Sequence, residues 1–83
     1  MKIHYFAWMR EHTQCAPEEI SLPDGVNNVE QLIAYLKSTS AGHETALRNI
    51  RTVRVAVNKQ YAQLEDAVSN DDEVAFFPPV TGG

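Results

Sequence analysis

The chain has 83 residues, 43% of them hydrophobic and 22% charged, which is typical of one small globular domain and argues against intrinsic disorder. Eleven acidic against seven basic residues give a net charge of −4, which argues against non-specific nucleic-acid binding because such binding needs clustered positive charge. A single cysteine excludes an internal disulfide, and the first residues lack a signal-peptide pattern. No apolar run nears the ~20 residues that a membrane span needs. We therefore expect a cytoplasmic protein with no nucleic-acid or membrane partner.

The N-terminal third predicts two strands separated by a short helical turn. Lys2 to Trp8 is rich in aromatic and β-branched residues and contains neither Gly nor Pro, which predicts a strand. Alternating charges from Met9 to Gln14 indicate a helical turn, and Glu18 to Leu22 predicts a second short strand. The sequence Pro23-Asp24-Gly25 then turns the chain.

An amphipathic helix follows this turn. Asn28 is suited to cap the helix, and Gln31 lies three residues on, in the capping-box position. Apolar residues then recur at the i, i+3, i+4, i+7 spacing of one helix face, at Val29, Leu32, Ile33 and Leu36. The helix is expected to end within residues 38–42.

The second half of the chain predicts a shorter helix and three strands. The helix covers His43 to Ile50, and the strands cover Thr52 to Asn58, Tyr61 to Ala62 and Glu73 to Phe77. Tight turns are expected between the strands, at Asn58-Lys59-Gln60 and Asn70-Asp71-Asp72. The side chains expected to face the core are Ala46, Leu47, Ile50, Val53, Val55, Val57, Val74 and Phe76.

The order of these elements, β-β-α-(α)-β-β-β, predicts an α+β fold. One amphipathic helix needs one apolar surface, and a mixed sheet of four or five strands supplies it. This is the ubiquitin-like β-grasp arrangement. We expect the domain to cover residues 1–77 and an extended C-terminal tail to cover residues 78–83.

The tail carries the chemistry that the sequence suggests. Pro78 and Pro79 cannot donate backbone hydrogen bonds, so the last strand must stop before them. The six tail residues reach roughly 20 Å when extended. Gly82 and Gly83 have no Cβ and fit a slot too narrow for other residues, and the only functional group of the tip is the Gly83 carboxylate. This design suits acyl chemistry in the active site of another protein.

The whole chain resembles the MoaD/ThiS family of ubiquitin-like sulfur carriers, in its MoaD-type branch of small subunits of molybdopterin synthase. The segments that carry the resemblance are Lys2-Ile3-His4-Tyr5-Phe6-Ala7 followed by Arg10-Glu11, Val55-Ala56-Val57-Asn58, and Asp72-Glu73-Val74-Ala75-Phe76-Phe77-Pro78-Pro79-Val80-Thr81-Gly82-Gly83. Two turns depart from the family pattern: Asp71-Asp72 replaces the usual Asp-Gly, and Gln14 and Cys15 lie where a glycine often closes the first loop.

The resemblance implies a sulfur carrier in molybdenum cofactor biosynthesis. An E1-like adenylating enzyme of the MoeB type would use ATP to adenylate Gly83, and a sulfur donor protein would convert the adenylate to a thiocarboxylate. The tail would then enter the large, MoaE-type subunit of molybdopterin synthase, which supplies the catalytic side chains, and deliver sulfur to cyclic pyranopterin monophosphate. The resemblance implies a heterotetramer of two carriers and two large subunits, and no cofactor bound by this chain alone.

An exposed aromatic patch is expected to bind the partner. Phe6 lies on the strand face opposite Ile3, and Phe77 opposite Phe76, so these aromatics point away from the core. The family positions that match Phe6, Tyr61 and Phe77 lie on the partner-binding surface. The tail residues implied to enter the large subunit are Pro78, Pro79, Val80, Thr81, Gly82 and Gly83.

Other polar residues predict no further site. Cys15 lacks a neighbouring Cys or His pattern and is interpreted as an incidental thiol. The three histidines, His4, His12 and His43, lack metal-ligand spacing, so we expect surface or edge positions for them and no metal site. The alternative functions are a sulfur carrier for thiamine or tRNA thiolation, a protein modifier conjugated through Gly83, and a binding module with an inert tail.

Overall fold

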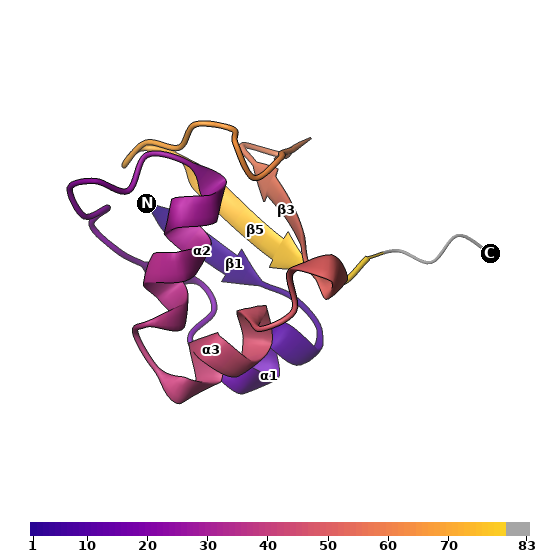
Figure 1. Cartoon of the computed structure of the whole chain (residues 1–83). Helices are drawn as coiled ribbons and strands as arrows, with labels where there is room; N and C mark the ends of the chain where they lie inside the picture. The colour runs from indigo at the N-terminus through magenta and orange to yellow at the C-terminus, as the bar shows by residue number, and fades with distance from the viewer. Residues whose placement is uncertain (80–83) are drawn as a thin grey trace.

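A five-stranded mixed sheet of order β2-β1-β5-β3-β4 forms the centre of residues 1–79, the part of the chain that the computed structural model describes (Figure 1). Its strands are β1 (Lys2–Tyr5), β2 (Glu18–Glu19), β3 (Arg54–Val57), β4 (Gln60–Tyr61) and β5 (Glu73–Phe77). The central neighbours β1 and β5 are parallel, and the other pairs are antiparallel. The predicted mixed sheet is confirmed.

The centre of the core lies where β1 meets β5. Ile3 pairs with Val74, and Tyr5 pairs with Phe76, so these four side chains point to the same face of the sheet. All four are at most 1% exposed, and the Tyr5 and Phe76 rings stack with centroids 5.8 Å apart. Burial of side chains of this size contributes about 1.5–3 kcal/mol each.

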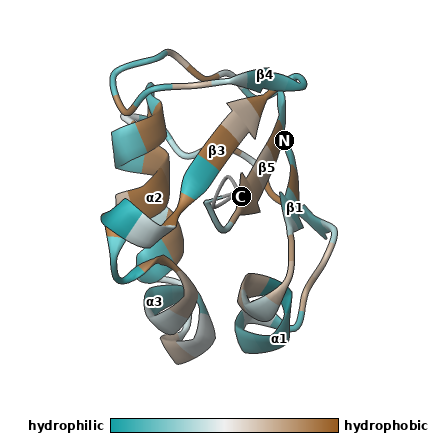
Figure 2. Cartoon of the chain, turned by 90° about the vertical axis from the view of Figure 1, so that its right-hand side faces the viewer, coloured by the Kyte–Doolittle hydropathy of each residue, from teal (hydrophilic) through white to brown (hydrophobic). Residues whose placement is uncertain are grey.

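The main helix, α2 (Val29–Lys37), covers this face of the sheet (Figure 2). The Asn28 side chain accepts a hydrogen bond from the Gln31 backbone, which confirms the predicted cap, while the Gln31 side chain accepts from the backbone of Asn27. The four residues of the predicted apolar stripe are all buried: Val29, Leu32, Ile33 and Leu36.

Two short helices close one end of the core. The first, α1 (Trp8–Thr13), packs against α3 (Ala41–Leu47), and the two lie together at the bottom of Figure 1. Gly42 lies at a tight contact between them, because a Cβ built there would lie 2.0 Å from the His12 carbonyl oxygen. A glycine is therefore required where α3 crosses the end of α1.

The first two predicted strands were too long. The chain leaves the sheet after Tyr5 because Ala7 has a φ of 55°, and Trp8 starts α1 instead of ending a strand. The second strand is assigned only at Glu18–Glu19, because beyond Ile20 the backbone bonds to a side chain: the Leu22 N–H donates to Asn70 Oδ1. The predicted turn after it is confirmed, with a φ of 87° at Gly25.

Three boundaries of helices and strands in the second half of the chain also differ from the predicted ones. The helix α3 begins before His43 because Ser40 caps it, and it ends at Leu47. A 3-10 turn, η1 (Ile50–Thr52), follows and turns Ile50 outward, where it is 40% exposed, so its predicted inward position was wrong. The strand β3 starts only at Arg54.

The predicted reversal between β3 and β4 is confirmed. Asn58 and Lys59 both have positive φ, 52° and 69°, as a two-residue type I′ hairpin turn requires. The short strand that follows begins one residue earlier than predicted, at Gln60.

Within residues 1–79, none of the helices is long and apolar enough to cross a membrane.

Gly42→Ala tests the close contact between α1 and α3. Alanine normally favours helices over glycine, but here its Cβ would meet a backbone carbonyl, so we expect a loss of about 1–3 kcal/mol in the free energy of unfolding. Chemical denaturation measures this. Thr45→Ala, at an exposed position of the same helix, is the control and should change stability by less than about 0.5 kcal/mol. Equal stability of wild type and Gly42→Ala would contradict the packing argument.

Candidate functional site

The outer face of the sheet carries a small apolar surface. Ala75 lies between His4 and Ala56 in neighbouring strands, and Ala56 pairs with Tyr61 on the edge strand. Because paired residues point to the same face, this row faces away from α2. The strands bring the two alanines together with Tyr61 and Phe77, and Phe6, just after β1, lines a shallow pocket with both alanines. We call this surface the outer-face platform; it consists of Phe6, Ala56, Tyr61, Ala75 and Phe77.

The predicted aromatic patch is exposed in the structure. Tyr61 is 78% exposed and Phe6 is 48% exposed, while Phe77 is half-buried. The Tyr61 and Phe77 rings lie 5.8 Å apart, so the edge strand covers part of Phe77. Exposed aromatics of this size are typical of interfaces. The role of these three residues in binding a partner stays a prediction.

Phe6 belongs to a more polar part of the platform. Its ring stacks on His4 with centroids 6.3 Å apart, and His4 Nε2 lies 2.8 Å from Glu73 Oε2. This hydrogen bond from His4 lowers the pKa of the Glu73 carboxyl. The platform therefore has an apolar end at Tyr61 and Phe77, while its other end, at Phe6, borders the polar pair of His4 and Glu73.

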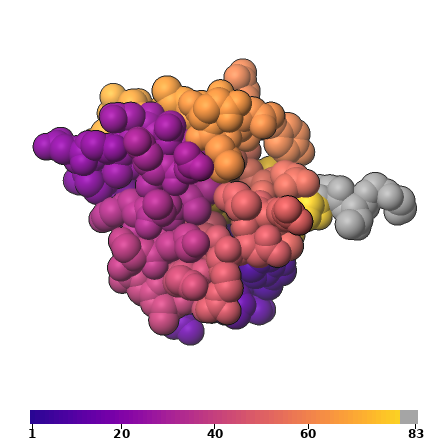
Figure 3. Space-filling model, viewed as in Figure 1, coloured from indigo at the N-terminus to yellow at the C-terminus, as the bar shows by residue number. Residues whose placement is uncertain are grey.

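A groove of about 560 Å³ adjoins the apolar side of the platform. In Figure 3, the segment near residue 50 lies directly beside the yellow end of β5, and the orange segment near residue 65 lies above it. The side chains of Arg51 and Arg54 lie beside apolar side chains in the groove. The groove therefore suits a partner surface with both apolar and acidic groups. Its lining residues are Ile33, Ile50, Arg51, Val53, Arg54, Val55, Tyr61, Ala62, Gln63, Leu64 and Phe77.

Ile50, Arg51 and Arg54 were missed as site residues by the sequence. Ile50 has the spacing of a core residue on the predicted helix, and nothing in the local pattern shows that η1 turns it outward. The alternation of β3 predicts that Arg54 faces outward, but its place opposite Phe77 depends on the pairing with β5.

The C-terminal segment starts from this surface. The last strand ends at Phe77, directly before the two prolines, as predicted, and Pro78 and Pro79 are both half-buried. The other predicted tail residues, Val80, Thr81, Gly82 and Gly83, lie outside the described residues. The tail therefore leaves β5 beside the platform and the groove, and its role in sulfur transfer stays a prediction.

A hydrogen-bond network fixes the hairpin that carries Tyr61. Asn58 Nδ2 donates to Asp72 Oδ1 at 2.9 Å, and the Glu73 backbone N–H donates to Asn58 Oδ1 at 3.0 Å. The backbone N–H of Ser69 donates to Asp72 Oδ2 at 2.8 Å. The bonds from Asn58 and Ser69 lower the pKa of the Asp72 carboxyl. This carboxylate thereby ties the β3–β4 turn to the start of β5.

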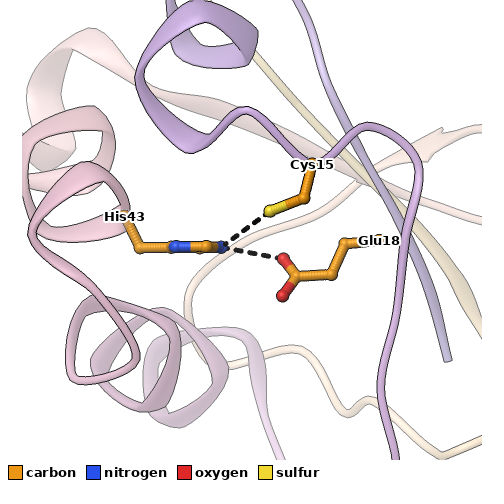
Figure 4. Close-up of side chains that lie close together, drawn as sticks. All are labelled: Cys15, Glu18 and His43. Carbon is orange, nitrogen blue, oxygen red and sulfur yellow. Dashed lines mark hydrogen bonds and ion pairs between the residues drawn. The ribbon is translucent and has the colours of Figure 1, made fainter.

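A second polar cluster lies elsewhere in the fold, between the loop after α1 and the first turn of α3. It consists of Cys15, Glu18 and His43 (Figure 4). His43 is only 4% exposed, so its predicted surface or edge position was wrong, whereas His12 is exposed and His4 is half-buried. The sequence missed this cluster because Cys15 and His43 are 28 residues apart. Burial and the neighbouring Glu18 carboxylate raise the pKa of the Cys15 thiol.

Comparison with known proteins relates the chain to one family. Residues 3–83 match the model of the ThiS family. A molybdopterin synthase sulfur carrier subunit from Haemophilus influenzae is 36% identical over 83 residues, which cover the whole chain and 99% of that protein. The protein of the same name from Escherichia coli is 32% identical over 83 residues, with the same coverage.

Solved structures confirm the predicted β-grasp fold. SAMP1 from Haloferax volcanii superposes with a TM-score of 0.79 at 26% identity, over the whole chain and 98% of that protein. A complex of subunits 1 and 2 of the molybdopterin-converting factor from Helicobacter pylori contains a chain that superposes with a TM-score of 0.66 at 22% identity. That match covers 99% of this chain and 96% of the other and supports the fold.

Asp72→Asn tests the network beneath Tyr61 through its pH dependence. The folded pKa of Asp72 lies below the unfolded value of about 3.9, so its contribution to stability is present above that pH and is lost as the pH falls through the folded pKa. We expect Asp72→Asn to lower the free energy of unfolding at pH 7 by about 1 kcal/mol, a modest amount because the site is partly solvated. The difference in this free energy between the variant and wild type should shrink below about pH 3.9.

Urea denaturation at several pH values measures this difference. Asp71→Asn is the matched control, because it removes the same charge from an exposed neighbour without removing these hydrogen bonds. A loss of stability in Asp72→Asn that is constant from neutral pH to pH ~3 would show that the carboxylate charge is irrelevant.

Proposed function

The chain belongs to the ThiS family, and from this membership we propose that it is the sulfur carrier subunit of a molybdopterin synthase. The observation that carries the proposal is the end-to-end match to two sulfur carrier subunits at 36% and 32% identity. The match to the family model includes Gly82 and Gly83, the residues on which the chemistry depends. The fold and the position of Pro78 and Pro79 after a central strand agree with this function.

The proposed chemistry takes place on the Gly83 carboxylate in the active sites of other proteins. A carboxylate is a poor electrophile because it is anionic. An E1-like adenylating enzyme of the MoeB type transfers AMP from ATP to it, releasing pyrophosphate and forming an acyl-adenylate. Sulfur that a donor protein supplies at the sulfide level then displaces AMP as the leaving group, and the product is a thiocarboxylate with a nucleophilic sulfur.

Sulfur delivery requires the large subunit. We propose that the thiocarboxylate enters a MoaE-type subunit, which supplies the catalytic side chains, and gives its sulfur to cyclic pyranopterin monophosphate. The carboxylate of Gly83 is restored when oxygen from water replaces the transferred sulfur. A dithiolene has two sulfur atoms, so two carriers that bear a thiocarboxylate are used for each product. A heterotetramer with two carriers, in the cytoplasm, would supply both.

The outer-face platform and its groove are the proposed docking surface for the large subunit. Phe77 and Tyr61 present aromatic area directly beside the point where the tail leaves the sheet. Pro78 and Pro79 stop the tail from continuing β5, because they have no N–H to donate and a fixed φ. Binding at the platform would therefore direct the tail into the partner. Arg51 and Arg54 add positive charge at the groove.

Deletion of Gly83 tests the carrier function. Incubation of the wild-type chain with an adenylating enzyme, ATP and a sulfur donor should give a mass increase equal to the replacement of one oxygen by sulfur. The deletion variant should keep its circular dichroism spectrum and lose the ability to support molybdopterin formation. Activity of the deletion variant would rule out the carrier function, and attachment of wild type to target lysines in cells would instead identify a protein modifier.

Tyr61→Glu and Phe77→Glu test the docking surface. Each change places a charge among apolar contacts, so we expect the dissociation constant for the large subunit to rise at least about tenfold in titration calorimetry. Tyr61 is 78% exposed, so its variant should fold normally. Thr45→Glu, an equal charge change at an exposed position of α3, is the control. Wild-type affinity of both variants would place the interface elsewhere.

A further inference from the structure

The cluster of Cys15, Glu18 and His43 has no part in the proposed sulfur transfer. Its three side chains come from three segments: the loop after α1, the first residue of β2 and the first turn of α3. None of them lines the groove beside the platform. One donor atom from each, a sulfur, an oxygen and a nitrogen, lies within 4.8 Å of the other two.

The three donor atoms converge on one point. Glu18 Oε1 lies 2.8 Å from His43 Nε2, and Cys15 Sγ lies 3.7 Å from the same nitrogen (Figure 4). A nucleophilic Cys-His-Glu relay needs the carboxylate and the thiol on opposite ring nitrogens, so that one orients the imidazole while the other gives up its proton. Here both face Nε2, which is the arrangement of ligands around an ion and does not suit a proton relay.

We propose that Cys15, Glu18 and His43 form a binding site for Zn²⁺. Thiolate, imidazole and carboxylate are all ligands of this ion, and a set of three protein ligands leaves the fourth tetrahedral position to water. The softness of the thiolate favours zinc over magnesium or calcium, which prefer oxygen ligands alone.

The spacing of the donor atoms fits a tetrahedral site after a small movement. Ideal zinc bond lengths place a sulfur and a nitrogen ligand about 3.6 Å apart and a nitrogen and an oxygen ligand about 3.3 Å apart. The sulfur–nitrogen distance in the structure is 3.7 Å. The nitrogen–oxygen distance is 2.8 Å, so the Glu18 carboxylate must retreat by about half an ångström. The Glu18 side chain is 19% exposed and has room to do so.

The groups around the cluster suit the ligands to a metal. Ser40 Oγ lies 2.7 Å from His43 Nδ1, so it accepts the Nδ1 proton when Nε2 holds the ion. Tyr5 Oη donates to Glu18 Oε1 at 2.9 Å and orients the carboxylate. Metal-binding histidines and carboxylates typically have such outer partners, which fix the tautomer and the ligand position.

Access to the site is open from the Cys15 side. Cys15 and Glu18 are half-buried, while His43 is buried beneath them, so an ion approaches from solvent and the buried imidazole holds its inner side. Binding converts the thiol to a thiolate, and its proton leaves to solvent. The ion would join the loop after α1 and β2 to α3, in the region where Gly42 already brings α1 and α3 together.

Titration of the reduced full-length chain with Co²⁺ and Zn²⁺ tests the proposal. We expect one equivalent of Co²⁺ to bind with a thiolate-to-cobalt charge-transfer band in the near ultraviolet, and Zn²⁺ to displace it. The melting temperature should rise with Zn²⁺ concentration, because the ion binds the folded state. Loss of an outer partner typically weakens metal binding 10–100-fold, and loss of a direct ligand should weaken it at least as much, so Cys15→Ser and Glu18→Gln should each weaken binding at least about tenfold.

His4→Gln is the matched control. His4 and Glu73 form a second His-Glu pair at the same 2.8 Å distance but without a cysteine, so this variant should bind Co²⁺ as wild type does. Cys15 is half-buried and not in the core, so Cys15→Ser should fold, which circular dichroism verifies. Absence of the charge-transfer band in wild type, or unchanged affinity in Cys15→Ser, would overturn the proposal and identify the cluster as a hydrogen-bonded structural contact only.

Discussion

The parallel pairing of β1 with β5 is the constraint on which the rest of the structure depends. It joins the first strand to the last, places Tyr5 against Phe76 in the centre of the core, and makes β5 an inner strand between β1 and β3. An inner strand is hydrogen-bonded on both sides and does not fray readily. The segment that begins with Pro78 therefore starts from the central strand of the sheet, and this gives the proposed carrier tail a rigid base.

The alternation of side chains along β5 divides the molecule into two faces with different functions. Val74 and Phe76 point inward to α2 and hold the fold, while Ala75 and Phe77 point outward and contribute to the platform. The small size of Ala56 and Ala75 leaves the aromatics standing at the margins of the platform. A partner that docks there meets an apolar surface next to the groove, close to the point where Pro78 follows β5. The strand that stabilises the domain thus also contributes to its proposed recognition surface.

The far end of the core shows a different principle. There α1 and α3 approach so closely that Gly42 has no room for a Cβ, and the contact brings the buried His43 to Cys15 and Glu18. A buried imidazole needs partners for both of its nitrogens, and Ser40 and Glu18 supply them. The proposed zinc site and the proposed sulfur-transfer surface use separate residues, so mutations can probe each without altering the other.

The sequence by itself determined the features that depend on near neighbours. The cap at Asn28, the apolar face of α2, the Asn58-Lys59 turn and the end of β5 before Pro78 follow from local spacing and backbone chemistry, and the structure agrees with all four. The exposure of Phe6 also follows from strand alternation, whereas that of Tyr61 was implied by the family resemblance. The family resemblance added the chemistry of Gly83, which local patterns alone left open.

Only the tertiary structure decided the features that depend on distant segments. Ile50 has the sequence spacing of a core residue, yet η1 turns it into the groove, and the strand predicted through Trp8 stops at Tyr5 because Ala7 bends the chain into α1. Cys15 and His43 meet because α1 packs on α3, a contact between segments far apart in the sequence. Periodicity reports which face a residue occupies within its own element, but the packing of whole elements fixes which faces meet.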